Sequence, residues 1–144
     1  METTPTWRLD WDESLSMFIP EIDNEHRRFI RLVNELNEAI VDRLDRSELQ
    51  KRMQYILDDA AEHFAHEEAL FKEWHYPDAE EHALKHAAIT EALNEIMSQF
   101  KHDDAMYVWV AAGIKIKEIL INHLLTEDMK YRDFCRTLMS AGVP

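Results

Sequence analysis

Apolar residues recur at alternating steps of three and four along most of the chain, the spacing of one face of a bundle helix. The first such row opens shortly after Pro20 and predicts a helix over about residues 24–42, with Asp23 as its N-cap. The inward-facing positions of this helix are Ile22, His26, Phe29, Val33, Leu36 and Ile40. One face is therefore expected to be buried along its whole length.

Three further rows of the same spacing predict three more long helices. The second helix begins at Ser47, where SELQ is a capping box, and ends before Pro77. The third opens at Asp78, where Glu81 completes another capping box, and a turn at 101–104 leads into the fourth. The row of the second helix is Leu49, Met53, Ile56, Ala60, His63, Glu67, Leu70 and Trp74. The row of the third helix is Ala79, His82, His86, Ile89, Leu93, Ile96 and Phe100. The row of the fourth helix is Met106, Trp109, Gly113, Ile116, Leu120 and His123.

Four long helices joined by short turns predict an all-α fold, an antiparallel four-helix bundle in up-down-up-down order. We expect residues 1–144 to form one domain with three parts: an irregular N-terminal arm (1–22), the bundle (23–128), and a short C-terminal helix with its tail (129–144). The helix near 129–139 is expected to pack across one end of the bundle. The arm carries three aromatic rings that are expected to cover the end of the core, those of Trp7, Trp11 and Phe18.

Each apolar row is interrupted by histidine or glutamate at one end only. The interruptions lie at the start of the first and third helices and the end of the second and fourth: His26, His63, Glu67, His82, His86 and His123. In an antiparallel bundle these four helix ends meet, so five histidines and a glutamate are expected in one core layer. The opposite end is expected to be filled by Val33, Ile40, Leu49, Met53, Leu93, Phe100 and Met106.

Such a layer favours a bound metal ion. A buried carboxylate and several imidazoles are costly without partners, and a cation removes that cost. These ligand types suit iron, zinc, copper or manganese. His63 with Glu67, and His82 with His86, are four residues apart and so about 40° apart around a helix, close enough for each pair to bind one ion. A single buried histidine is more commonly a hydrogen-bonded core residue, and a hydrogen-bonded network without metal is the alternative.

The remaining histidines are predicted to be at the surface. His66 lies on the polar flank of its helix, with a contact to a metal ligand as the alternative, and His75 and His102 lie in or beside turns. The zinc-protease pattern H-E-x-x-H fails because position 70 is Leu70. Other polar residues are also expected to face solvent: Glu68, Asp58, Asp59, Asp103 and Asp104.

Composition narrows the function further. Hydrophobic residues make up 46% of 144 residues, with only two glycines and four prolines, which suits a helical domain. The net charge of −13 argues against binding to nucleic acid or to an anionic membrane surface. The start of the chain has neither the basic flank nor the apolar run of a signal peptide, and no stretch is long enough to span a bilayer. Cys135 is the single cysteine and cannot form an internal disulfide, which argues against an oxidised secreted protein. The surface charge favours a soluble monomer, so we expect a cytoplasmic monomer.

The histidine motifs follow one another in a specific order. A lone histidine in DNEH precedes HFAHE at 63–67, HALKH at 82–86 and HLLTED at 123–128. This ordered set resembles the hemerythrin family of non-haem diiron oxygen-binding bundles. The segments WDESLS and EEALFKEWHYPDAEEH also resemble bacterial members. Glu25 stands where the family often has glutamine, a departure expected to alter contacts around the ligands and not ligation itself.

The resemblance implies a pair of iron ions with an oxo or hydroxo bridge derived from solvent. It assigns one iron to His82, His86 and His123, and the other iron to His26 and His63. Glu67 and Asp128 would bridge the two irons. Dioxygen would bind end-on, as a peroxide, to the iron with fewer histidines. Three apolar side chains are expected to line the oxygen pocket: Phe64, Leu120 and Leu124.

One of these ligands conflicts with helical spacing. Asp128 is five residues after His123, about 140° away on an ideal helix, whereas Glu127 is four residues on and fits the row. Spacing alone selects Glu127, and the resemblance selects Asp128. We take Asp128 and predict that the fourth helix breaks or bulges between His123 and Asp128.

The function expected from the resemblance is reversible oxygen binding for storage, delivery or sensing, without catalysis. The absence of an attached signalling segment favours a carrier, and no physiological partner, whether an oxygen-using enzyme or a signalling protein, can be named. A second hypothesis is a diiron enzyme, an oxidase or peroxidase or one reacting with nitric oxide. Oxidising ferritin-like sites pair glutamate and histidine three residues apart, and no histidine here has a glutamate three residues before it. A third hypothesis is a metal-binding or storage protein that does not bind oxygen.

Overall fold

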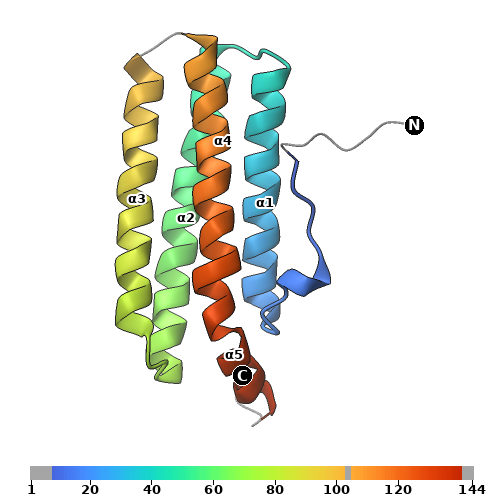
Figure 1. The fold of residues 1–144 in the computed structure, drawn as a ribbon, viewed down its shortest axis with the longest axis vertical. Helices are drawn as coiled ribbons and strands as arrows, with labels where there is room; N and C mark the ends of the chain where they lie inside the picture. The colour runs from blue at the N-terminus through green and yellow to red at the C-terminus, as the bar shows by residue number, and fades with distance from the viewer. Residues whose placement is uncertain (1–7, 103–104, 141–144) are drawn as a thin grey trace, which may run out of the picture.

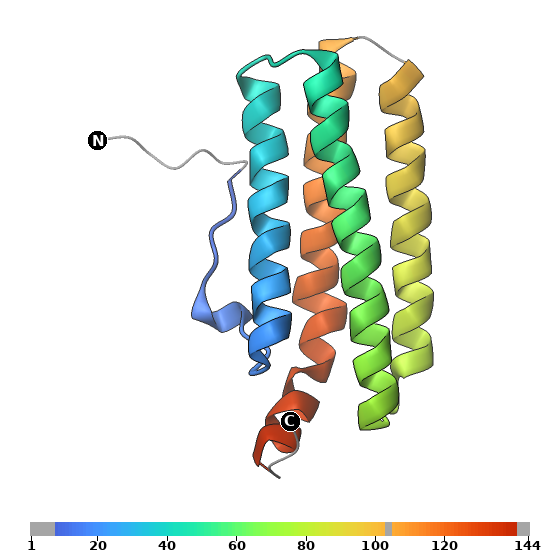
Figure 2. The same ribbon diagram turned by 180° about the vertical axis from the view of Figure 1, so that it is seen from behind.

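The computed structural model describes residues 8–102 and 105–140, and within them it shows the expected antiparallel four-helix bundle. Helices α1 to α4 stand side by side, with α1 against α2 and α4, and α3 against the same two helices (Figure 1). The view from behind shows residues 8–19 of the N-terminal arm running along the outside of α1 (Figure 2). The elements are η1 (Glu13–Leu15), α1 (Pro20–Val41), α2 (Arg46–Trp74), α3 (Ala79–His102), α4 (Met106–His123), η2 (Leu124–Asp128) and α5 (Met129–Ser140). None of the described helices combines the length and apolar character needed to cross a bilayer.

Helix α1 begins earlier than predicted, at Pro20, and its N-cap residue Ile19 makes no side-chain capping bond. Proline is well suited to this position because its fixed φ matches the helix and its missing N–H is not needed there. The prediction that Asp23 caps the helix is wrong. Asp23 is buried in the first turn, and its carboxylate accepts hydrogen bonds from Ser16 Oγ at 2.6 Å and from the Met17 backbone N–H at 2.7 Å. Asp23 therefore fixes the arm against the bundle.

Helix α2 is capped by Asp45, whose side chain accepts a hydrogen bond from the Glu48 backbone N–H at 2.9 Å. The predicted cap, Ser47, lies inside the first turn, two residues after the observed cap. The end is as predicted. His75 terminates the helix in the left-handed conformation, with φ of 55°, two residues before Pro77.

The apolar rows form the core with few exceptions. At the end of the bundle away from the histidines, every predicted residue is buried except Met106, which is 42% exposed because it lies in the first turn of α4. Leu70 is half-buried, whereas the neighbouring Phe71 is 1% exposed. A helix with 3.6 residues per turn drifts away from a strict heptad spacing, and this drift moves the buried position by one residue over a helix as long as α2.

Gly113 allows α1 and α4 to approach closely. A Cβ atom at this position would lie 2.5 Å from Asn37 Oδ1 and 2.8 Å from Ile40 Cδ1, so any side chain here would force these two side chains to move. Asn37 is buried and donates from Nδ2 to the Gly113 carbonyl at 3.4 Å and to the Val33 carbonyl at 3.0 Å. The polar amide is thereby satisfied inside the core.

The arm and α5 cover the end of the bundle to which the histidine-bearing segments converge, the lower end in Figure 1. Their apolar side chains form one cluster with the end of α2: Met17, Ile19, Ile22, Phe71, Trp74, Tyr76, Tyr131 and Cys135. Trp11 and Phe18 are both half-buried. Trp11 packs against a separate small cluster of Leu15, Ile30 and Leu124, and the guanidinium groups of Arg132 and Arg136 lie 4.9 and 4.8 Å from the Phe18 ring. The cover is therefore mainly aliphatic in the arm and aromatic in α2 and α5. Trp7, Asp103 and Asp104 lie outside the described residues.

Candidate metal centre

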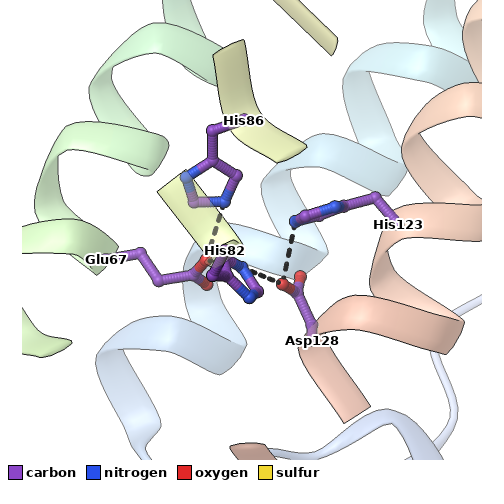
Figure 3. A group of neighbouring side chains, drawn as sticks. All are labelled: Glu67, His82, His86, His123 and Asp128. Carbon is purple, nitrogen blue, oxygen red and sulfur yellow. Dashed lines mark hydrogen bonds and ion pairs between the residues drawn. The ribbon is translucent and has the colours of Figure 1, made fainter. Parts of the chain in front are cut away.

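Seven buried side chains from five elements meet at the covered end of the bundle. They are His26 on α1, His63 and Glu67 on α2, His82 and His86 on α3, His123 at the end of α4, and Asp128 at the end of η2. Figure 3 shows five of them facing one another across the bundle: Glu67, His82, His86, His123 and Asp128. All seven residues expected from the sequence are thus brought together, each less than a tenth exposed.

The predicted break after His123 is present as a π-helix over Leu124–Asp128. A π-helix is wider than an α-helix, with i→i+5 hydrogen bonds, so a residue five positions on returns to the same face. As a result, Asp128 Oδ1 lies 3.0 Å from His123 Nε2. Glu127 instead forms an ion pair with Lys130 at 3.1 Å, away from the centre. The structure therefore selects Asp128 and not Glu127 for the cluster.

One set of short distances joins the three histidines of α3 and α4 to one oxygen of each carboxylate. Glu67 Oε1 lies 2.8 Å from His82 Nε2 and 3.0 Å from His86 Nε2. Asp128 Oδ1 lies 3.1 Å from His82 Nε2 and 3.0 Å from His123 Nε2. These five ligand atoms lie within 4.8 Å of one another, a spacing that one metal ion could hold.

The remaining carboxylate oxygens face the other two histidines. Glu67 Oε2 lies 3.3 Å from His63 Nε2, and Asp128 Oδ2 lies 3.3 Å from His26 Nε2. This second group of four residues also keeps its ligand atoms within 4.8 Å of one another. Glu67 and Asp128 belong to both groups, so the pocket is arranged as two adjacent cation sites that share both carboxylates.

Several of these atoms have no hydrogen-bond partner among the described residues. They are buried and point inward: the Nε2 atoms of His26, His63, His86 and His123, and Oδ1 of Asp128. Orphaned buried polar atoms destabilise a fold unless something satisfies them. A pair of cations would satisfy them all, and the nitrogen and oxygen donors suit first-row transition metals such as iron. The residues present therefore fit a metal centre.

Without metal, the pocket is a set of mutually stabilised charges. Burial opposes a charge on His63, but its hydrogen bond to Glu25 and its ion pair with Glu67 raise its pKa to about 10. Burial likewise opposes a charge on His82, and Asp128 and Glu67 raise its pKa to about 9. Burial would raise the pKa of Glu67, yet the neighbouring imidazoles of His63, His82 and His86 hold it well below its ordinary value. The carboxylates are therefore ionised, as metal ligation requires, and a metal ion must displace protons from the imidazoles.

Two of the buried histidines have a carboxylate on their outer nitrogen. Glu25 Oε1 lies 2.7 Å from His63 Nδ1, and Glu68 Oε2 lies 3.1 Å from His86 Nδ1. An N–H at Nδ1 donating to a carboxylate leaves the lone pair of Nε2 directed into the pocket, the arrangement that most metal-bound histidines show. Glu25 thus contacts a member of the cluster, as its position in the sequence suggested. Glu68 was predicted only to face solvent, and its contact with His86 was missed.

Two other surface predictions are corrected. His66 is only half-exposed, because its Nδ1 lies 2.7 Å from the second oxygen of Glu25. Asp59 is 7% exposed and pairs with Arg28 Nε at 2.7 Å, although it had been expected on a solvated face. Both side chains lie where α1 packs on α2, a contact that the polarity of one helix cannot reveal. His75 and His102 are exposed as predicted.

Tyr131 belongs to the centre, although no motif in the sequence identified it. It lies on α5, is fully buried, and its hydroxyl donates to Glu67 Oε2 at 2.5 Å. Burial and the neighbouring Glu67 raise the pKa of the phenol well above its ordinary value, so the hydroxyl keeps its proton. Glu67 Oε2 is the oxygen facing His26 and His63, so the hydrogen bond acts on the side of the smaller histidine group.

Replacing Tyr131 with phenylalanine is expected to lower the free energy of unfolding of the metal-free protein by about 1.5–3 kcal/mol, because a buried carboxylate loses a donor. Urea denaturation measures this directly. Tyr107 is 75% exposed and supplies the matched control. The Y107F variant should stay within about 0.5 kcal/mol of the parent. Equal stabilities for Y131F and Y107F would contradict a stabilising role for the hydroxyl.

The three residues expected to line an oxygen pocket are all buried beside the cluster or just beyond it. The Phe64 ring stacks on His86, with centroids 4.0 Å apart and planes 9° apart. Leu120 is part of the main core with Phe64, whereas Leu124 packs with Leu15 and Ile30 under the arm. The wall of the cluster nearest the main core is therefore apolar.

A four-helix bundle with two carboxylate-sharing histidine groups at one end defines a helical metal-binding protein. The family model of the Hemerythrin HHE cation binding domain matches residues 17–135. The chain belongs to the hemerythrin family. It is similar to bacteriohemerythrin of Pseudomonas aeruginosa (strain LESB58), with 26% identity over 136 residues that cover 92% of this chain and 84% of the relative. It is also similar to bacteriohemerythrin of Stenotrophomonas maltophilia (strain R551-3; 27% over 125 residues, 87% and 80% covered) and to myohemerythrin of Theromyzon tessulatum (25% over 122 residues, 85% and 89% covered).

Proposed function

We propose that this protein binds dioxygen reversibly at a diiron centre and does not turn it over. The observation that carries the proposal is the unequal division of histidines between two groups that share both carboxylates. Five protein ligands surround one position and four surround the other, so an ion in the smaller group keeps room for an added ligand. Membership of the hemerythrin family supports iron as the metal and dioxygen as that ligand.

In this proposal the chain supplies orientation and exclusion of water, while a ferrous pair supplies the electrons that dioxygen takes up on binding. The seven residues of the cluster hold the irons, with Glu67 and Asp128 reaching both. Glu25 and Glu68 fix the rings of His63 and His86 through their Nδ1 atoms. Phe64, Leu120 and Leu124 form apolar walls that keep water from the open position. An oxo or hydroxo group derived from solvent would complete the diiron centre.

The proposal extends to the organisation of the domain and to its location in the cell. We propose that residues 1–144 act as one unit, a cytoplasmic monomer in which 23–128 hold the metal while the arm and C-terminal helix cover it. The net charge of −13 supports solubility, and the buried Cys135 supports a reducing compartment. Storage, delivery and sensing all use the same binding reaction.

Reconstitution tests the proposal. Metal-free protein is loaded with ferrous iron under anaerobic conditions, and air is admitted and then removed while the visible spectrum is recorded. We expect a coloured form that appears with air and fades when air is removed, over repeated cycles. Colour that develops once and persists, or steady consumption of an added reductant, would support a diiron oxidase or peroxidase instead. Binding of a single zinc ion, or failure to take up a pair of irons, would support a metal-storage role.

A further inference from the structure

A second feature adjoins the metal centre on its outer side, between α1 and α2. It is a cavity of about 280 Å³. Its walls are formed by Glu25, Arg28, Asp59, Glu62, His63 and His66. The His63 side chain is 2% exposed and belongs to the smaller histidine group, whereas that of His66 is 36% exposed. The cavity therefore extends from the protein surface to a residue of the metal centre.

The charges in this cavity favour a cation. Three of its residues carry carboxylates, against the guanidinium of Arg28 and, in the metal-free protein, the protonated imidazole of His63, so negative charge exceeds positive charge. Arg28 is itself paired with Asp59 Oδ1 at 2.7 Å. A fourth carboxylate, from Glu21, lies 3.6 Å from His66 Nε2 at the surface. Glu62 and His66 are four residues apart and so share one face of their helix. A carboxylate and an imidazole with this spacing are well placed to hold a divalent metal ion between them.

A buried oxygen in the same wall points to a cationic ligand independently. Asp59 is 7% exposed, and its Oδ2 atom has no hydrogen-bond partner among the described residues. Arg28 contacts only the other oxygen, Oδ1. A buried carboxylate oxygen without a donor is unfavourable, and burial raises the pKa of Asp59 for the same reason. A cation passing through the cavity would meet this oxygen.

Glu25 connects the cavity to the centre. Its Oε2 lies 2.7 Å from His66 Nδ1 and its Oε1 lies 2.7 Å from His63 Nδ1, so one carboxylate joins an exposed imidazole to a buried one. The larger cavity on the neighbouring face, about 570 Å³ between α2 and α3, reaches His86 but differs in character. Its walls include Phe64 and four alanines, namely Ala61, Ala65, Ala83 and Ala87. Glu68 and Glu91 also line this cavity, but half of its walls are apolar, whereas every residue that lines the α1–α2 cavity is polar or charged.

From these observations we propose that the α1–α2 cavity is the entry site through which divalent metal ions reach the centre. Glu62 and His66 capture the ion at the surface, and Asp59 and Glu25 bind it on the way to His63. The proposal rests on the metal centre of the proposed function but not on dioxygen binding. It concerns the rate of loading, because none of the capturing residues belongs to the two groups that hold the metal.

Stopped-flow loading of the metal-free protein with Co²⁺ tests this proposal, because the ion reports its own binding through visible absorption and requires no dioxygen. The double variant Glu62→Gln, His66→Gln removes the capturing groups without touching the cluster. We expect its second-order loading rate to fall about tenfold, the scale on which local charge governs encounter rates. The final amount of bound Co²⁺ and its absorption band should equal those of the parent.

The matched control is Glu91→Gln, which removes a carboxylate from the wall of the α2–α3 cavity. This variant should load at the rate of the parent. Equal slowing in both variants would mean that net charge and not the α1–α2 cavity governs loading, and an unchanged rate in the double variant would also overturn the proposal. A loss of bound Co²⁺ at saturation would assign Glu62 and His66 to the stability of the centre instead. A protein that loads Co²⁺ as expected but does not bind dioxygen reversibly would refute the proposed function alone.

Discussion

Replacing His63 with alanine is expected to abolish the paired metal site, whereas replacing His66, three residues later on the same helix, should leave it largely intact. His63 is one of only two histidines in the smaller group, and its Nε2 points into the pocket, 3.3 Å from Glu67 Oε2. Even changes to residues that merely support a ligand weaken metal binding by about 10- to 100-fold, so losing the ligand itself should cost more than about 100-fold at this position. Iron content after anaerobic reconstitution, together with the visible spectrum, measures the difference.

The H63A and H66A variants can be compared directly because both histidines form a hydrogen bond with Glu25. In the H66A variant, Glu25 keeps its 2.7 Å contact with His63, so the ring that faces the metal remains oriented. In the H63A variant, Glu25 and His66 remain paired but nothing replaces the inward-facing nitrogen. H63A should therefore bind at most a single iron, and H66A should bind a pair, although we expect it to load more slowly. Loss of iron in H66A with retention in H63A would mean that the helical register of α2 is assigned incorrectly.

The sequence was sufficient for the bundle and for the layer in which the histidines meet. Helical spacing is set by backbone geometry and depends little on the rest of the chain, so rows such as Phe29, Val33 and Leu36 identify a buried face reliably. Short turns then fix which helix ends lie together. His26, His63 and His123 could be placed at one end by this argument alone, and the structure places them there.

The residues that sequence reasoning missed act across elements. Tyr131 reaches Glu67 from 64 positions away, and Glu68 was placed outside because only its own helix could be considered. The packing of α1 on α2 buries Asp59, whose neighbours in the sequence are polar or small. Helix starts failed for a related reason. Asp23 and Ser47 have the chemistry of caps, but Asp23 is used to hold the arm and Asp45 caps α2 two residues before Ser47.

Asp128 marks the limit of arguments from helical spacing, and replacing it gives the second large effect that we expect. In the D128N variant, a side chain shared by both groups loses its charge and presents an amide nitrogen in place of one oxygen. Both metal positions should be weakened together, so reconstituted protein should retain less than a single iron per chain. The neighbouring E127Q variant removes an equal charge that lies outside the cluster. Because Glu127 pairs with the exposed Lys130, its loss should change stability by at most about 1 kcal/mol and leave the iron pair in place.

This pair of variants tests the π-helix as well as the ligand. In a regular α-helix, the residue four positions after His123 would face the metal, so E127Q would be the damaging change. The wider turn over Leu124–Asp128 moves that role by one residue, at the cost of a backbone form that is rare outside functional sites. If E127Q lost its iron while D128N kept it, the register of η2 would be wrong and the ligand choice by spacing would be correct. We expect the opposite result, loss of iron in D128N and retention in E127Q. That result would show that the π-helix brings a second shared carboxylate, Asp128, to a centre for which helices α1 to α4 supply only Glu67.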